Sequence, residues 1–174
     1  MAMSGSMIRV PAGLTTEGLI GRRYVARFID SMLIALLITA AARLAGTGLP
    51  KNVGGSANSL FGFLLFLILW IGYGTALESS PWQATLGKRW MRLRVYDARG
   101  GRLSLLQAAG RNLTKDGPFL VFQFIPGGGL LSLILLGAHV LVLHRSPVYQ
   151  AIHDCVAHTW VAAPEEVTQL HLRL

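Results

Sequence analysis

The chain has 174 residues and a formal net charge of +8; 52% of its residues are hydrophobic and only 14% are charged. A soluble domain carries about 25% charged residues, so this composition argues against an ordinary soluble domain and favours a membrane protein. The single cysteine excludes an internal disulfide framework. The N-terminal sequence lacks the apolar core of a signal peptide, and we expect residues 1–20 to be a cytoplasmic tail.

Two apolar stretches in the first half of the chain predict membrane spans. The first begins with RRYVARFID and predicts a span over residues 27–45. The second, LFGFLLFLILWIGYGTAL, carries no charge and predicts a span over residues 59–77, because about 18 apolar residues cross about 30 Å of hydrocarbon.

A third apolar stretch, residues 117–143, is too long for one ordinary span. The sequence IPGGG interrupts it at 125–129, and proline and glycine end helices. We therefore expect a hairpin of two spans over 108–125 and 129–144. One tilted helix is the alternative, which would give three spans in all. The preceding SLLQAAGRNLTKDG has leucines at helical spacing and predicts an amphipathic lead-in at the membrane interface.

The basic residues show how these spans are oriented. Four precede the first apolar stretch, residues 28–42, two lie between the first and second stretches, eight lie between the second and the third, and two follow the last. The positive-inside rule then places the N-terminus and the basic segment 78–107 in the cytoplasm. With four spans the C-terminal tail, 164–174, is cytoplasmic too, and we expect a multi-pass protein of the cytoplasmic membrane. The charge is thus explained by topology, and we expect no nucleic-acid partner.

Two segments have strand character. WMRLRVYD alternates, with Met91, Leu93 and Val95 on one face and Arg92, Arg94 and Tyr96 on the other, and HTWVAA follows the last span at 158–163. In the four-span arrangement the two segments can pair under the membrane. The expected fold is therefore an all-α membrane protein, a small bundle of four spans with a short cytoplasmic β-like ribbon.

The most informative polar residues lie at the entry of the first span. Arg27 and Asp30 are three residues apart and share a helix face. An ionisable group at membrane depth indicates function, although an Arg–Asp pair that merely locks helices together is an equal alternative. After the last span come His153 and Asp154. Their spacing from His158 does not suit a metal site, and we expect no metal.

Other polar residues give weaker signals. Glu78 and Asp116 lie at the ends of apolar stretches, where an interfacial and inert role is expected, although Glu78, Lys88 and Arg111 are candidates to support the Arg27–Asp30 site. The Gly87–Lys88 pair lacks the remaining residues of a phosphate-binding loop. Because no nucleophile stands beside a base, we expect neither an enzyme nor a cofactor.

Three motifs in order resemble the RDD family of bacterial membrane proteins. They are RRYVARFID, QATLGKRWMRLRVYDARGGRLSLLQAAGRNL and AIHDCVAHTWV, within residues 21–163. The resemblance implies that Arg27, Asp30 and Asp154 are the family's signature arginine and aspartates, with His153 beside them. Leu86 replaces a proline usual in the family, and Cys155 and His158 also depart from its pattern. The resemblance further implies a family of largely unknown function, with cation or proton antiport proposed for some members.

Two functions remain open from the sequence. In the first, the protein transports an ion or small solute with a cluster of Arg27, Asp30 and Asp154 near the cytoplasmic side, where Arg27 neutralises one or both aspartates. In the second, it is a non-catalytic scaffold or assembly factor. It would then act as a homo-oligomer, beside a membrane partner protein, or on anionic lipids of the bilayer through four arginines: Arg92, Arg94, Arg99 and Arg102.

Overall fold

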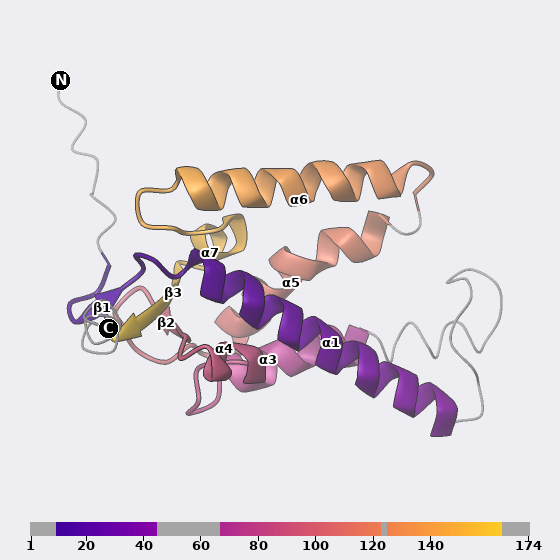
Figure 1. The fold of residues 1–174 in the computed structure, drawn as a ribbon, viewed down its shortest axis with the longest axis horizontal. Coiled ribbons are helices and arrows are strands. Elements are labelled where there is room, and N and C mark those ends of the chain that lie inside the picture. Colours follow the sequence, from indigo (N-terminus) through magenta and orange to yellow (C-terminus); the bar gives the residue numbers. More distant parts are fainter. Residues whose placement is uncertain (1–9, 45–66, 123–124, 165–174) are drawn as a thin grey trace.

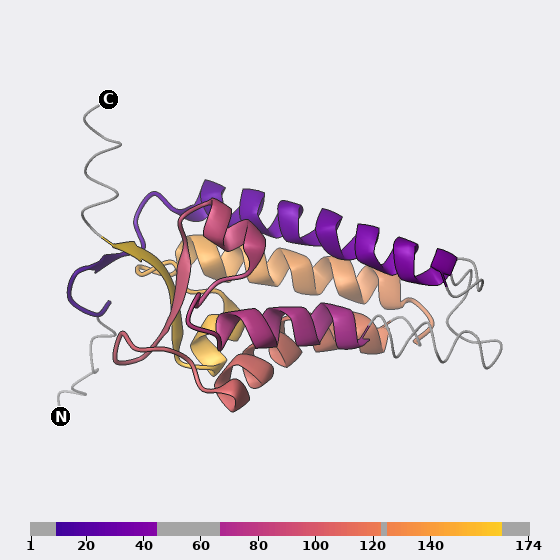
Figure 2. The same cartoon turned by 90° about the horizontal axis from the view of Figure 1, so that it is seen from below.

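A computed structural model describes residues 10–44, 67–122 and 125–164 of the chain. In these parts, helical segments run side by side from a small sheet at one end (Figures 1 and 2). The long segments are α1 (Ile20–Leu44), the consecutive turns η1 (Ile68–Gly72) and α3 (Tyr73–Glu78), α5 (Leu105–Phe122) and α6 (Gly128–Arg145). Two one-turn helices, α4 (Leu86–Trp90) and α7 (Ile152–Val156), lie in the connections near the sheet.

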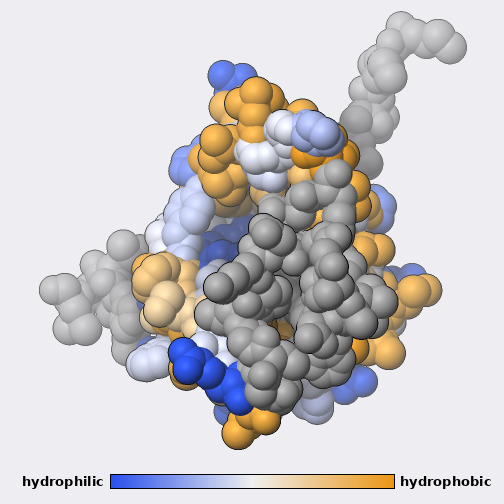
Figure 3. All heavy atoms as spheres, turned by 90° about the vertical axis from the view of Figure 1, so that its right-hand side faces the viewer, coloured by the Kyte–Doolittle hydropathy of each residue, from blue (hydrophilic) through white to orange (hydrophobic). Residues whose placement is uncertain are grey.

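The outer faces of the bundle are apolar. Large side chains such as Phe28, Leu36 and Leu133 are exposed, which a soluble protein of this size rarely tolerates over a continuous surface. Seen from the end opposite the sheet, hydrophobic residues cover much of the visible outside, with hydrophilic residues at its top and lower left, and further hydrophilic atoms are visible in the depth between them (Figure 3). Two helices in the described ranges are long and apolar enough to cross a membrane, over Ile20–Ala41 and Gly128–Arg145.

The helix boundaries differ in part from the predicted spans. Helix α1 begins at Ile20, seven residues before the predicted span, so Arg23 also belongs to it. The first part of the predicted span 59–77, residues 59–66, lies outside the described residues, and the remainder forms η1 and most of α3. The predicted break at 125–129 is confirmed, because α5 ends at Phe122 and α6 begins at Gly128, after Gly127 with φ of +77°.

The strand pairing predicted from the sequence is confirmed, and a third strand joins it. Strand β3 (Thr159–Pro164) lies in the centre, antiparallel to β2 (Arg94–Asp97) and to β1 (Leu14–Thr15). The register pairs Val95 with Val161 and Leu14 with Pro164. The segments before α1, between α3 and α5, and after α6 therefore meet at one end of the bundle.

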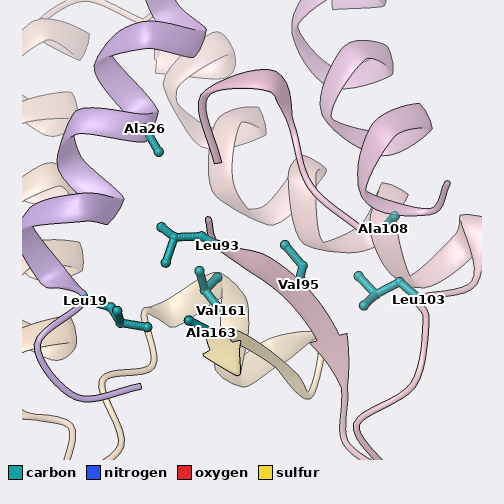
Figure 4. Close-up of a cluster of buried hydrophobic side chains, with 8 residues drawn as sticks. All are labelled: Leu19, Ala26, Leu93, Val95, Leu103, Ala108, Val161 and Ala163. Carbon is teal, nitrogen blue, oxygen red and sulfur yellow. The ribbon is translucent and has the colours of Figure 1, made fainter. Parts of the chain in front are cut away.

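A hydrophobic core joins this sheet to the helices. Leu93, Val95 and Val161 project from the strand segments toward Ala26 of α1 and Ala108 of α5 (Figure 4). The other sheet face is covered as well: Tyr96 and Trp160 are buried together and pack against Leu14. Tyr96 thus lies on the face opposite Val95, as the alternation predicts, and the N-terminal segment, expected to be a tail, covers it with Val10 and Leu14.

Candidate functional site

Helix α5 carries its polar residues on the inside. Arg111, Asn112 and Asp116 are buried, whereas Leu106 and Leu113 are exposed, at 82% and 56%. This pattern is the reverse of a soluble amphipathic helix, as expected where the outer face meets lipid. The residues of the expected amphipathic lead-in form the start of α5, which is one continuous helix from Leu105 to Phe122.

Arg111 lies at the centre of a buried ionic network. Its Nη1 donates to Oε2 of Glu78 at 2.6 Å, and its Nη2 donates to Oδ1 of Asp154 at 2.6 Å. Its Nε also donates to Oδ1 of Asp154 at 3.0 Å, and to the Thr159 hydroxyl at 3.2 Å. The guanidinium fork suits such multiple contacts. One side chain on α5 thereby joins α3, α7 and β3.

Glu78 is fully buried between cations. Besides Arg111, it pairs with Lys88 and accepts a hydrogen bond from Nδ2 of Asn112 at 3.0 Å. Burial alone would raise the pKa of Glu78, but the charges of Arg111 and Lys88 outweigh it and hold that pKa below its usual range. Burial lowers the pKa of Lys88 to about 8, against the opposing effect of Glu78. Glu78 therefore takes part in a buried ionic network and is not the inert side chain expected at the end of an apolar stretch.

Asp154 is also fully buried and has two arginine partners. It pairs with Arg111 and with Arg23 of α1, and its Oδ2 accepts the backbone N–H of Ala151 at 3.2 Å. Burial favours the neutral acid, but Arg111, His153 and Arg23 hold the pKa of Asp154 well below its usual range. Through these two ion pairs, Asp154 links α7, and the strand β3 that follows it, to α1 and α5.

Asp30 interacts with a different set of groups. Its Oδ1 accepts the Tyr73 hydroxyl and the backbone N–H of Gly87, both at 2.8 Å, and its Oδ2 accepts the Thr85 hydroxyl at 2.5 Å. These donors are all neutral, and in the described ranges no cation forms an ion pair with Asp30. Asp30 holds the start of α4 on α1.

Arg27 does not neutralise either signature aspartate. Its Nη2 pairs with Oδ1 of Asp116 at 2.5 Å, and its guanidinium lies over the Trp70 ring, 5.1 Å from the centroid. Lys115 approaches the other oxygen of Asp116 at 3.4 Å. The three signature residues therefore do not contact one another as predicted, because residues of α3, α4 and α5 are their nearer partners. The Asp116 and Asp154 contacts are linked through Lys115, Asn112 and Glu78, whereas Asp30 has its own set of neutral donors. Asp116, expected to be inert, thus belongs to the linked contacts.

A cavity of about 810 Å³ lies between the helices and connects these contacts. Arg27 and Asp30 line it from α1, Tyr73 from α3, and Asp116 from α5. Apolar side chains of α1, α5 and α6 complete the wall, and its volume lies within the range of about 300–1,000 Å³ typical of small-molecule sites. The cavity therefore has a charged end and an apolar wall.

Two histidines lie on the α6 and α7 side of this cavity. The rings of His139 and His153 are stacked, with centroids 5.7 Å apart. Burial lowers the pKa of His153 well below its usual value, although neighbouring Asp154 opposes this. Within the described ranges, no group of three or more histidine, cysteine, aspartate or glutamate side chains lies close enough to hold a metal ion.

The start of the central motif, QATLGKRW at residues 83–90, lies against Asp30 of α1. A Cβ atom on Gly87 would overlap the carbonyl oxygen of Ala26 and lie 3.0 Å from the Asp30 carboxylate, so only glycine allows α4 to approach α1 this closely. Gln83 donates to the carbonyl oxygens of Val95 and Gly101, and so supports β2. The motif thus fixes the connection that carries Thr85 and Lys88.

Sequence reasoning missed several residues of the site. Arg23, Asn112, Lys115 and Tyr73 were not among the candidates, although Arg111, Asn112, Lys115 and Asp116 recur at helical spacing, which could have indicated one polar face. The four arginines proposed to contact lipid are all exposed near the sheet and lie outside the cavity: Arg92, Arg94, Arg99 and Arg102.

The part of the chain that lines the cavity also matches a known protein family. The sequence model of the RDD family matches residues 18–158, which include the cavity-lining parts of α1, α3, α5 and α6. No curated protein matches the chain.

Proposed function

Because the chain belongs to the RDD family of membrane proteins, we propose that it moves a small solute or ion across the membrane through the cavity between α1, α3, α5 and α6. The observation that carries this proposal is Asp30. It is a buried carboxylate on the cavity wall whose hydrogen-bond donors are neutral and which forms no ion pair with a cation in the described ranges. Ionisable side chains at membrane depth that face a cavity mark ion pathways in membrane proteins.

The other two signature residues have different roles in this proposal. Asp154 is a structural residue that keeps the sheet attached to the bundle, because its oxygens are occupied by Arg23, Arg111 and a backbone N–H. Arg27 shapes the charged end of the cavity. The proposal places the sheet on the cytoplasmic side, because the basic residues gather there.

The test measures proton movement in proteoliposomes that contain a pH-sensitive dye. Pulses of Na⁺ or K⁺ are expected to change the internal pH with wild-type protein, and Asp30→Asn is expected to abolish the response while the protein stays folded. The control is Asp97→Asn, which alters a carboxylate in the β2 turn, outside the cavity. A folded Asp30→Asn protein with wild-type flux would overturn the proposal, as would a wild-type response no larger than that of protein-free liposomes.

A second candidate function rests on the exposed arginines. In it, the sheet end holds anionic lipid headgroups through Arg92, Arg94, Arg99 and Arg102, each contributing about 1 kcal/mol near an anionic surface. Native mass spectrometry of protein released from mixed micelles tests it. Replacing all four arginines with glutamine is expected to reduce bound phosphatidylglycerol but not phosphatidylcholine, and equal retention of both lipids contradicts it.

A further inference from the structure

We propose that the cavity binds an organic anion that carries one apolar chain, with its anionic group at Arg27 and its chain along α1, α5 and α6. This inference names the solute class of the proposed transport site, and in that sense rests on the proposed function. It is carried by three independent features of the cavity: the exposure of Arg27, the balance of charge, and the character of the wall.

Arg27 is the most accessible cation among the ion pairs of the site. Its side chain is 42% exposed, whereas that of Arg111 is 1% exposed and those of Arg23, Lys88 and Lys115 are 11–16% exposed. Among the described residues, its hydrogen bond to Asp116 uses Nη2, which leaves Nε and Nη1 for a ligand. A guanidinium with two free donor positions recognises a carboxylate, sulfonate or phosphate oxygen pair.

The charge of the site leaves room for one anion. Five cations line the cavity, and four carboxylates lie among them, so the positive charges exceed the negative charges by one within the described ranges. The cations are Arg23, Arg27, Lys88, Arg111 and Lys115, and the carboxylates are Asp30, Glu78, Asp116 and Asp154. An uncompensated charge is costly away from water, and a bound monoanion would neutralise the site.

The wall beyond Arg27 suits an apolar chain. Ile34 and Ile38 of α1, Phe119 and Leu120 of α5, and Leu136 of α6 line it. Trp70, under the Arg27 guanidinium, forms the boundary between the charged and apolar parts. A ligand that is charged throughout would leave this wall unused, and a purely apolar ligand would leave Arg27 without a partner.

Binding is measured without any gradient, through the thermal unfolding of the protein in maltoside micelles. The probe is octanesulfonate, a permanent anion with one short chain, and it is expected to raise Tm in a saturable manner. Methanesulfonate, which lacks the chain, and octyltrimethylammonium, which carries the opposite charge, are expected to raise Tm little. If either matches octanesulfonate, the cavity does not select the combination of charge and chain, and the inference is wrong.

Variants of the chain test the position of the ligand. Arg27→Gln is expected to weaken octanesulfonate binding about tenfold to a hundredfold, which corresponds to the loss of a hydrogen bond to a charged group. Lys115 remains beside Asp116, so this variant keeps a counter-charge there. Arg27→Lys is expected to retain part of the affinity. Arg92→Gln, at an exposed cation outside the cavity, is the matched control and is expected to bind as the wild type does.

A variant that leaves Arg27 intact provides the second test. Ala35→Phe adds a ring to the cavity wall and is expected to abolish binding of octanesulfonate. Folded Arg27→Gln and Ala35→Phe proteins that bind like the wild type would overturn the inference. Short-chain lysophosphatidylglycerol, which carries one acyl chain, in place of octanesulfonate distinguishes a membrane lipid from a soluble anion as the source, and Arg27-dependent binding of either supports the inference.

The binding and flux experiments separate this inference from the proposed function. Arg27-dependent binding by a protein that moves neither protons nor octanesulfonate across the proteoliposome membrane would uphold the anion site and refute transport. Conversely, Asp30-dependent flux without octanesulfonate binding would uphold transport and refute this solute class.

Discussion

Replacing Asp154 with asparagine removes one charge from the buried network and keeps nearly the same shape. Asp154 is fully buried and pairs with Arg111, which is 1% exposed, and with Arg23. Breaking a buried pair by removing one partner costs about 3–5 kcal/mol, because the other charge stays buried. Arg111 keeps Glu78, and Arg23 keeps the carbonyl oxygen of Tyr149, so we expect the lower end of this range, about 3 kcal/mol.

The matched comparison is Arg27→Gln, which changes another signature residue. Arg27 is 42% exposed, and an exposed ion pair contributes about 0–1 kcal/mol, so we expect this variant to cost less than about 1 kcal/mol. For a chain of this size, about 3 kcal/mol corresponds to a decrease in Tm of about 6–12 °C. Thermal unfolding in detergent, followed by circular dichroism, measures both variants under the same conditions.

A double variant tests whether the network acts as a unit. Adding Arg23→Gln to Asp154→Asn is expected to cost less than the sum of the two single changes, because the buried cation that lost its partner is also removed. The reasoning is refuted if Asp154→Asn lowers Tm no more than Arg27→Gln does. Strict additivity in the double variant would show that Arg23 and Asp154 contribute independently.

Three further predictions concern packing, pH and topology. Gly87→Ala is expected to destabilise the protein by about 1–3 kcal/mol, since its methyl group overlaps the backbone of α1, whereas Gly110→Ala, with open space around it, should unfold like the wild type in the same thermal assay. The pKa of buried His153 is held well below 6.5, so near pH 6 the unfolded chain binds a proton that the folded chain does not. The free energy of unfolding should therefore fall as the pH drops from about 6.5 to 5. If His153→Gln leaves this pH dependence of the free energy of unfolding unchanged, the prediction is wrong. Exposed Cys155 should react with a membrane-impermeant maleimide from the cytoplasmic side, and Gly129→Cys in a Cys155→Ser background should react from the opposite side. Labelling of both positions from the same side would contradict the prediction that α6, which separates them, crosses the membrane.

The sequence predicted those parts of the fold that depend on local signals. Proline and glycines at 125–129 separate α5 from α6, and alternation around Val95 predicts the strand that pairs with β3. These features depend on backbone chemistry and side-chain period, which neighbouring residues determine. Strand β1 could not be predicted in this way, because its two residues are too few to show an alternation of apolar and polar side chains.

Partner choice within the site could not be predicted in the same way. Arg27 and Asp30 share a helix face, so the sequence favours their pairing, but the pairs that form depend on how α5 and α4 pack against α1. Asp116 then reaches Arg27, and the neutral donors of α4 reach Asp30. The positions of ionisable groups are local properties, whereas their partners are set by tertiary packing.

The order of strands in the sheet has a consequence for biosynthesis. Central strand β3 follows α6 in the chain, so the ribosome adds it after every helix of the bundle, while β1 and β2 have already been made. Translation proceeds at about 5–20 residues per second, so the two edge strands wait several seconds without their common neighbour. Strand β3 can therefore pair with the two edge strands only after α6 has been made, which makes closure of the sheet a late step of folding.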